Sequence, residues 1–178
     1  MRVKSTKFKG LKIIEGLKFS DKRGYFREVY KKKLFSHSEL VFWCMSKSKK
    51  NVIRGMHLQT RFMQEKYVAV IKGKILDVVV DLRYKSKTFG KVFSIILSEK
   101  NCKSVFIPAG FAHGFCGMEK ENIIFYGNSN YRSAKSEISL SWNDRNLRIR
   151  WPTSKIIQSK KDSFSLSFKE FVEKKIKL

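Results

Sequence analysis

The sequence is short of several residue types that define whole classes of protein. Its 178 residues include only two prolines and three cysteines. Cys44, Cys102 and Cys116 are odd in number and lack the paired spacing of a zinc site or a disulfide framework, which indicates a reducing compartment. With 42% apolar residues and so few prolines, the chain is expected to fold rather than to remain disordered.

Long apolar segments are also missing. No run approaches the roughly 18 apolar residues that a membrane-spanning helix needs. The first ten residues, MRVKSTKFKG, lack the apolar core of a secretory signal peptide. We therefore expect a cytoplasmic protein with no membrane partner.

Acidic residues are scarce, with 15 Asp and Glu against 39 Lys and Arg, so the formal net charge is +24. Such a charge draws nucleic acid, acidic lipid surfaces or phosphorylated small molecules toward a protein. The lysines are spread through the chain, and no continuous basic helix or arginine-rich tail occurs, which argues against a nucleic-acid partner. The excess is equally consistent with lysine filling solvated positions.

Eight segments predict β-strands, because they are short, rich in β-branched and aromatic residues, and separated by turn-forming residues. These segments are residues 25–30, 66–72, 74–82, 91–98, 103–108, 122–127, 137–142 and 147–151. The link Lys72-Gly73 predicts a tight hairpin between two of them, since glycine supplies the positive φ of such turns. The spacing of the segments is typical of an all-β sandwich or barrel.

The C-terminal segment differs, since apolar residues recur there at helical spacing from Leu166 to Ile176. It predicts a short helix packed on the outside of a sheet. Because no repeat, linker or low-complexity tract divides the chain, we expect residues 1–178 to form one jelly-roll domain with this C-terminal helix.

Two short motifs suggest a shared pocket. NVIRGMHLQ (51–59) and IPAGFAHGF (107–115) each place a histidine beside small residues at the end of a strand-like segment, where backbone or a ligand can come close. His57 and His113 are two of only three histidines in the chain. We therefore expect them to line one cavity.

Proton transfer is the chemistry that this set of residues favours. A histidine can take a proton from a carbon beside a carbonyl if a cation meets the developing negative oxygen. Arg54 and Lys66 could supply such cations near His57, and the phenol of Tyr126 could return a proton. A single histidine in an apolar strand is more often a hydrogen-bonded core residue, so the prediction rests on the whole set.

The motifs resemble those of one known family. DKRGYFREVY, VIRGMHLQ, QEKYVAVIKGKILDVVVDLR, SKTFGKV, LSEKN, IPAGFAHGF, WND and IRWP are similar, in that order, to the dTDP-4-dehydrorhamnose 3,5-epimerases, from about residue 19 to 165. The resemblance implies a cupin-like jelly roll, usually a homodimer. It also implies an isomerase that inverts carbons beside the 4-keto group of a nucleotide-diphosphate sugar without metal or redox cofactor.

By this resemblance, His57 stands at the position of the catalytic base, Tyr126 at that of the proton donor, and Lys66 beside the sugar carbonyl. Asp162 corresponds to the acidic partner of the base, in a segment that matches with altered spacing. His113 and Asp77 match a second polar pair of the cavity.

The same resemblance implies a substrate-binding set. Arg54 and Gln59 fall on positions that hold the diphosphate and nucleotide, and Ser46 is retained as well. The nucleotide positions also include Arg23, Phe26 and Glu28, which the resemblance implies reach across the dimer by strand exchange.

The sequence departs from the family at two places. Arg132, Ser133 and Ala134 stand where the family has a second tyrosine followed by Ser-Pro, and Cys44 replaces a usual asparagine. Arg132 would put a cation near the substrate. These departures suggest as a hypothesis that the substrate is GDP-linked or carries a heptose, or that only C3 inverts.

Two alternatives from other classes remain. With Gln59 and Glu65, the two histidines could hold iron or zinc in a metal-dependent cupin, although the His-x-His half of that signature lacks its second histidine. The other alternative is a basic module that binds nucleic acid.

Overall fold

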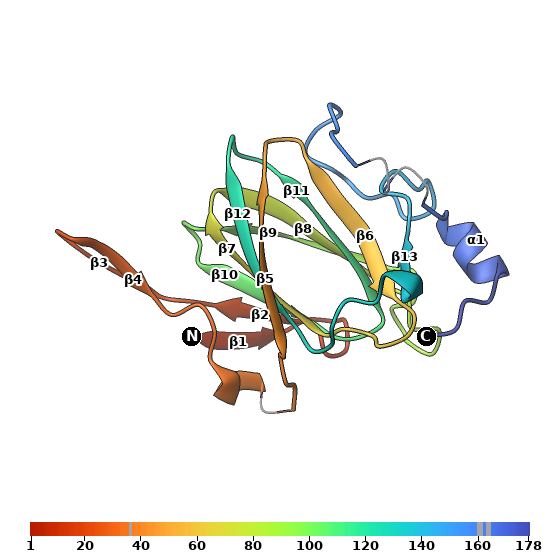
Figure 1. Cartoon of the computed structure of the whole chain (residues 1–178), viewed down its shortest axis with the longest axis horizontal. Coiled ribbons are helices and arrows are strands. Elements are labelled where there is room, and N and C mark those ends of the chain that lie inside the picture. The colour runs from red at the N-terminus through yellow and green to blue at the C-terminus, as the bar shows by residue number, and fades with distance from the viewer. Residues whose placement is uncertain (36, 160–161, 163–164) are drawn as a thin grey trace.

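A computed structural model describes residues 1–35, 37–159, 162 and 165–178. Figure 1 shows a β-sandwich with one short helix beside it. The strands are β1 (Arg2–Ser5), β2 (Lys12–Glu15), β3 (Lys18–Asp21), β4 (Gly24–Arg27), β5 (Phe42–Ser48), β6 (Ile53–Gln59), β7 (Lys66–Lys72), β8 (Lys74–Asp81), β9 (Val92–Ser98), β10 (Lys103–Ile107), β11 (Phe111–Gly117), β12 (Asn122–Asn128) and β13 (Glu137–Ser139). The helical elements are the 3₁₀ turns η1 (Lys32–Phe35) and η2 (Ala134–Ser136) and the α-helix α1 (Phe168–Glu173).

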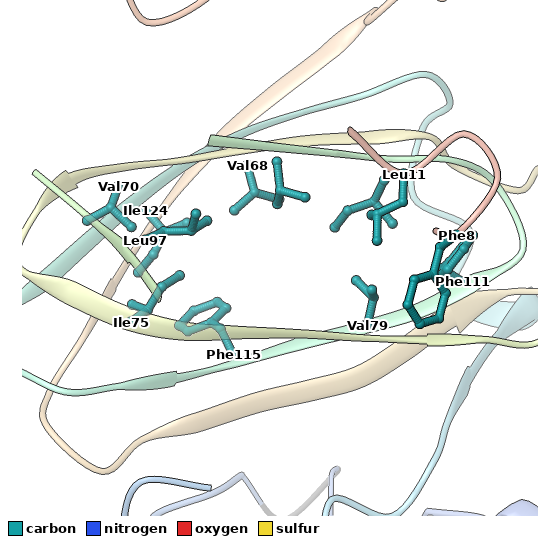
Figure 2. Packing of buried hydrophobic residues seen from close by; sticks show 12 residues of the cluster. Phe8, Leu11, Val68, Val70, Ile75, Val79, Leu97, Phe111, Phe115 and Ile124 are labelled. Atoms are coloured by element: carbon teal, nitrogen blue, oxygen red, sulfur yellow. The ribbon is translucent and has the colours of Figure 1, made fainter. Parts of the chain in front are cut away.

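Two antiparallel sheets enclose the interior. One has six strands in the order β1-β2-β10-β7-β12-β5, and the other has five in the order β13-β6-β11-β8-β9. Figure 2 shows side chains of the two sheets meeting between the layers, with Val68 and Val70 on one side and Ile75, Val79 and Phe115 on the other. These antiparallel layers confirm the expected all-β jelly roll.

The outer faces of both sheets are covered by apolar residues from the rest of the chain. Leu140, Leu147 and Phe171 pack on the five-stranded sheet, and Phe171 lies in α1. Ser167 and Glu170 form a capping box at the start of α1, which fixes where the helix begins. The prediction of a C-terminal helix outside the sheet is therefore confirmed.

The link at Gly73 differs from the expected hairpin. β7 belongs to the six-stranded sheet and β8 to the five-stranded sheet, so the chain crosses between layers at this point. Gly73 does have a positive φ of 82°, and a Cβ there would lie 2.3 Å from the carbonyl oxygen of Glu121. The predicted positive φ of Gly73 is confirmed. The turn that it permits joins two sheets, however, and is not a hairpin within one sheet.

Residues 147–151 are not a strand, which makes that prediction wrong. Arg148 has a positive φ of 49°, and its N–H donates to Asp144 O. Trp151 Nε1 donates to Trp142 O at 2.7 Å. The apolar residues of the segment pack on the outer face of the five-stranded sheet, so burial rather than strand pairing explains the pattern. The segment 25–30 likewise contributes to β4 only as far as Arg27.

The hairpin of β3 and β4 forms an arm that projects from the sandwich (Figure 1). The arm exposes three aromatic side chains, Phe19 at 60%, Tyr25 at 57% and Phe26 at 65%. Exposed aromatic residues grouped in this way are typical of an interaction surface. Separately, the described residues contain no helix long and apolar enough to span a membrane.

A β-bulge in β6 determines which of its side chains face the interior. His57 pairs with His113 of β11, but Arg54 pairs with Phe115, so two residues of β6 between these pairs lie opposite one residue of β11. In a regular strand, residues three apart point to opposite faces. Because of the extra residue, Arg54 and His57 both reach the interior.

Two glycines allow this bulge. Gly55 has a φ of 133°, and a Cβ on it would lie 2.4 Å from Gly114 Cα and 2.9 Å from His113 O. The sequence prediction that small residues near the histidines permit a close approach is therefore confirmed for the backbone of these two strands.

Gly55→Ala should destabilise the fold more than Gly24→Ala. Both glycines have a similar positive φ, 133° and 129°, but a Cβ at Gly24 meets nothing within 4 Å. Backbone strain of about 1–3 kcal/mol is common to both variants, and the clash between strands applies only to Gly55. Urea unfolding of the two variants measures the difference. Equal losses of unfolding free energy would contradict the close approach.

Candidate active site

A cavity of about 680 Å³ lies between the two sheets. Its lining comes from both sheets and from the segment that follows β13. Of the residues predicted for the site, it contains Arg54, His57, Gln59, Lys66, His113, Tyr126, Arg132 and Asp162. His57 and His113 therefore share one cavity, as the motifs predicted.

The two walls carry different groups. His57 on β6 and His113 on β11 belong to the five-stranded sheet, whereas Lys66 on β7 and Tyr126 on β12 belong to the six-stranded sheet. A ring-shaped substrate between these walls would have an imidazole on one side and a phenol on the other.

Asp162 makes a close pair with His57. His57 Nε2 lies 2.7 Å from Asp162 Oδ1, and the two side chains are 29% and 6% exposed. A ring N–H at Nε2 that donates to the carboxylate leaves Nδ1 as the nitrogen able to accept a proton. Burial lowers the pKa of His57, and the hydrogen bond with Asp162 acts in the opposite direction. The imidazole is thus kept neutral, the form that a base requires.

The segment that carries Asp162 is tied to the sandwich on both sides. Ile157 forms a parallel bridge with Val52, and Leu166 forms one with Leu140. Asp162 N donates to Ser159 between these anchors. The backbone pairing brings a carboxylate 105 residues distant in sequence to His57.

Lys66 and Tyr126 are both affected by burial. Burial lowers the pKa of Lys66, and the negative charge of Glu137 opposes this change. Burial also raises the pKa of Tyr126, and Cys44 on the neighbouring strand raises it further. Tyr126 and Cys44 are paired across β12 and β5, so their side chains lie on the same face of the sheet. The phenol therefore keeps its proton at neutral pH.

The second histidine also has a carboxylate partner. His113 Nε2 lies 2.8 Å from Asp77 Oδ2, and Asp77 is buried behind the cavity on β8. Arg54 lines the cavity near the start of β6, where its Nε donates to Ser48 Oγ at 2.9 Å and its Nη2 to Lys47 O at 3.2 Å.

Some predicted substrate-binding residues lie elsewhere. Arg23 and Phe26 are on the exposed arm, and Glu28 follows it in an ion pair with Lys31. Ser46 on β5 is outside the cavity lining found among the described residues, but it shares a sheet face with Tyr126 and acts to lower the pKa of that phenol. The chain does not bring the side chains of Arg23, Phe26 and Glu28 to its own cavity.

Glu137 is a cavity residue that sequence reasoning missed. Arg132 Nε lies 2.8 Å from Glu137 Oε2, and both residues line the cavity. The cation expected at Arg132 is therefore paired with a carboxylate of this chain. The sequence pattern predicts Glu137 only as the first residue of a strand. Its pairing with Gln59 depends on β13 lying beside β6 in the folded sheet.

The described residues contain no group of three or more His, Cys, Asp or Glu side chains able to hold a metal ion. Nε2 of each cavity histidine is held by a carboxylate, from Asp162 for His57 and from Asp77 for His113, and the amide of Gln59 bonds to backbone groups.

These features define a cupin-like jelly roll with a histidine–carboxylate pair in its interior. The dTDP-4-dehydrorhamnose 3,5-epimerase family model matches residues 5–170. Similar curated proteins are the dTDP-4-dehydrorhamnose 3,5-epimerases of Shigella flexneri, 38% identical over 91% of this chain and 93% of the relative, and Escherichia coli K12, 36% identical over 99% of both.

Solved structures give the same result. A dTDP-6-deoxy-D-glucose-3,5-epimerase from Legionella pneumophila, in complex with dTDP-4-keto-L-rhamnose, has a TM-score of 0.93 at 33% identity and covers 99% of this chain and 97% of its own. A dTDP-4-dehydrorhamnose 3,5-epimerase from Elizabethkingia anophelis has a TM-score of 0.88 at 38% identity, covering 95% and 97%. The chain belongs to the dTDP-4-dehydrorhamnose 3,5-epimerase family, and it is an epimerase.

Asp162→Asn should lower the pKa of His57 further. The substitution keeps the shape of the side chain but removes the negative charge that raises the pKa of His57 against burial. NMR titration of the imidazole resonances measures the shift. His113, whose partner Asp77 is unchanged, is the internal control. A His57 pKa that rises or stays constant would contradict the pairing.

Proposed function

We propose that the chain is a 3,5-epimerase of dTDP-4-keto-6-deoxyglucose. The observation that carries this proposal is the position of His57, paired with Asp162, across one cavity from Tyr126 and Lys66. The sugar and the nucleotide are taken from similar proteins, which are named as dTDP-sugar epimerases and include one in complex with dTDP-4-keto-L-rhamnose. The reaction needs only proton transfer, which these four side chains can perform.

The mechanism follows from the acidity of hydrogens beside a ketone. His57 Nδ1 removes the proton from C3 or C5, and the electron pair of the broken C–H bond moves to the C4 oxygen as an enolate. N–H groups of Lys66 meet this oxygen and stabilise its charge. Tyr126 then gives its proton to the same carbon from the opposite face, which inverts that centre. Solvent returns a proton to the phenolate and removes one from the imidazolium.

Asp162 and Arg54 have supporting roles in this proposal. Asp162 keeps the Nε2–H tautomer of His57 and stabilises the imidazolium that forms during each proton transfer. Arg54 lines the cavity near the start of β6, and its guanidinium suits the diphosphate of the substrate. His113 and Asp77 form a polar pair on the same wall.

The arm fits a homodimer. Arg23, Phe26 and Glu28 do not reach this chain's cavity, and the arm exposes three aromatic side chains. We therefore propose that a second copy inserts its arm and supplies these residues to the nucleotide. The protein would act in the cytoplasm as one domain over residues 1–178, in deoxysugar biosynthesis for surface polysaccharide.

Arg132 and Cys44, the two departures from the family, both line the cavity. They motivate the narrower hypothesis of a GDP-linked or heptose substrate, or of inversion at C3 alone. Incubation with dTDP- and GDP-linked 4-keto sugars in D₂O separates these cases. Deuterium at both C3 and C5 of the dTDP sugar, with turnover at least as efficient as that of any GDP sugar, would remove the narrower hypothesis.

His57→Asn and Tyr126→Phe should each lower turnover by about 10² to 10⁴, since each removes one positioned acid or base. Turnover is measured as solvent deuterium entering C3 and C5. His37→Asn and Tyr84→Phe are matched controls, because His37 packs its ring on Phe106 and Tyr84 donates to Phe171 O. A wild-type rate in His57→Asn would remove His57 from the role of base.

The pH profile of kcat/KM should have a broad plateau. His57 must be neutral, and its lowered pKa moves the acid limb below the usual value of about 6.5. Tyr126 must be protonated, and its raised pKa moves the basic limb above about 10. Initial rates across this range test both directions. A limb centred at about pH 7–9 would be inconsistent with these two residues as base and acid.

A further inference from the structure

Gln59 ends β6 and is almost completely buried. Its side-chain Nε2 donates to Phe62 O at 2.8 Å and to Tyr131 O at 3.3 Å. Its Oε1 accepts the backbone N–H of Ser133 at 2.7 Å. Both amide hydrogens and the amide oxygen are therefore engaged within the chain, although the residue lines the cavity.

These bonds join two loops to the strand that carries His57. The first loop comprises residues 60–65 and the second residues 129–136, and we call them the paired loops. They are also joined directly, since Gln64 Nε2 donates to Asn130 O at 2.8 Å and Asn130 Nδ2 donates to Met63 O at 2.8 Å. Side-chain amides buried in this way have few alternative partners, so they fix the geometry of the loops.

The paired loops hold one wall of the cavity. Arg132 lies between Tyr131 and Ser133, the two residues bonded to Gln59, and it pairs with Glu137. Gln64 at the other loop also lines the cavity. Movement of the second loop away from Gln59 would therefore separate Arg132 from Glu137, which lies on β13.

The position along β6 indicates which part of a substrate meets this wall. Arg54, His57 and Gln59 follow one another along the strand, and Gln59 lies roughly 7 Å beyond His57 at about 3.3 Å per residue. If Arg54 takes the diphosphate and His57 the reacting carbons, the Gln59 end faces the side of the sugar remote from the diphosphate.

We infer that Gln59 is a positioning residue for the sugar end of the cavity and not a ligand of the nucleotide. The inference rests on the proposed function, which sets the direction of the substrate. It differs from the nucleotide-binding role that the family resemblance implies for this residue. Gln59 acts through the paired loops, which hold Arg132 beside Glu137 of β13 and present it to the sugar.

The test is Gln59→Glu, which keeps the size of the side chain and replaces the donor with an oxygen facing two carbonyl oxygens. The KM for dTDP-4-keto-6-deoxyglucose should rise about tenfold or more, because two buried hydrogen bonds are lost. The dissociation constant for dTDP, which lacks the hexose of the substrate, should stay within about twofold of the wild-type value. Gln64→Glu removes a single donated bond and should have a smaller effect.

Two results would overturn the inference. One is a loss of dTDP affinity as large as the rise in KM, since Gln59 would then serve the nucleotide. The other is a KM equal to that of wild type.

Hydrogen exchange of the backbone amides tests the loop contacts without substrate. Residues 129–136 should exchange faster in Gln59→Glu than in wild type, and unchanged exchange there would also overturn the inference. Failure of the wild type to exchange hydrogen at C3 or C5 would contradict the proposed function instead, and the amide measurement would still decide the role of Gln59.

Discussion

The close approach of β6 to β11 at Gly55 and Gly114 is the constraint on which the site depends. It permits a bulge in β6, and the bulge turns Arg54 and His57 toward the same interior although they are three residues apart. A regular strand would send one of them to the outer face, where apolar side chains pack beneath α1. The two glycines therefore connect the packing of the five-stranded sheet with the chemistry of the cavity.

Burial determines the protonation states of the titratable groups in the cavity. It favours the neutral form of every titratable group, so it lowers the pKa of His57 and raises that of Tyr126. One wall thus carries a neutral imidazole and the other a protonated phenol, the forms that the proposed base and acid require. Asp162 limits the effect on His57, because its carboxylate stabilises the imidazolium once a proton arrives. The same sandwich interior that stabilises the fold prepares both groups for proton transfer.

The sequence was sufficient to predict the sandwich, the C-terminal helix and the sharing of one cavity by His57 and His113, because periodicity and local motifs carry that information. The sequence was not sufficient where contacts between residues distant in the chain determine the structure. Residues 147–151 look like a strand, but only their apolar side chains pack on a sheet, and Gly73 allows a turn between sheets rather than a hairpin. Glu137 and the loop contacts of Gln59 depend on β13 lying beside β6, which no local pattern indicates.

The central claim is that an imidazole and a phenol act on opposite faces of one sugar ring. A crystal structure of the protein with dTDP-glucose, which lacks the 4-keto group and so cannot react, tests it most directly. We predict that the pyranose ring lies between His57 and Tyr126, with C3 and C5 toward the imidazole on one face and the phenol on the other. A ring with both side chains on the same face, or one bound outside the cavity, would contradict the account.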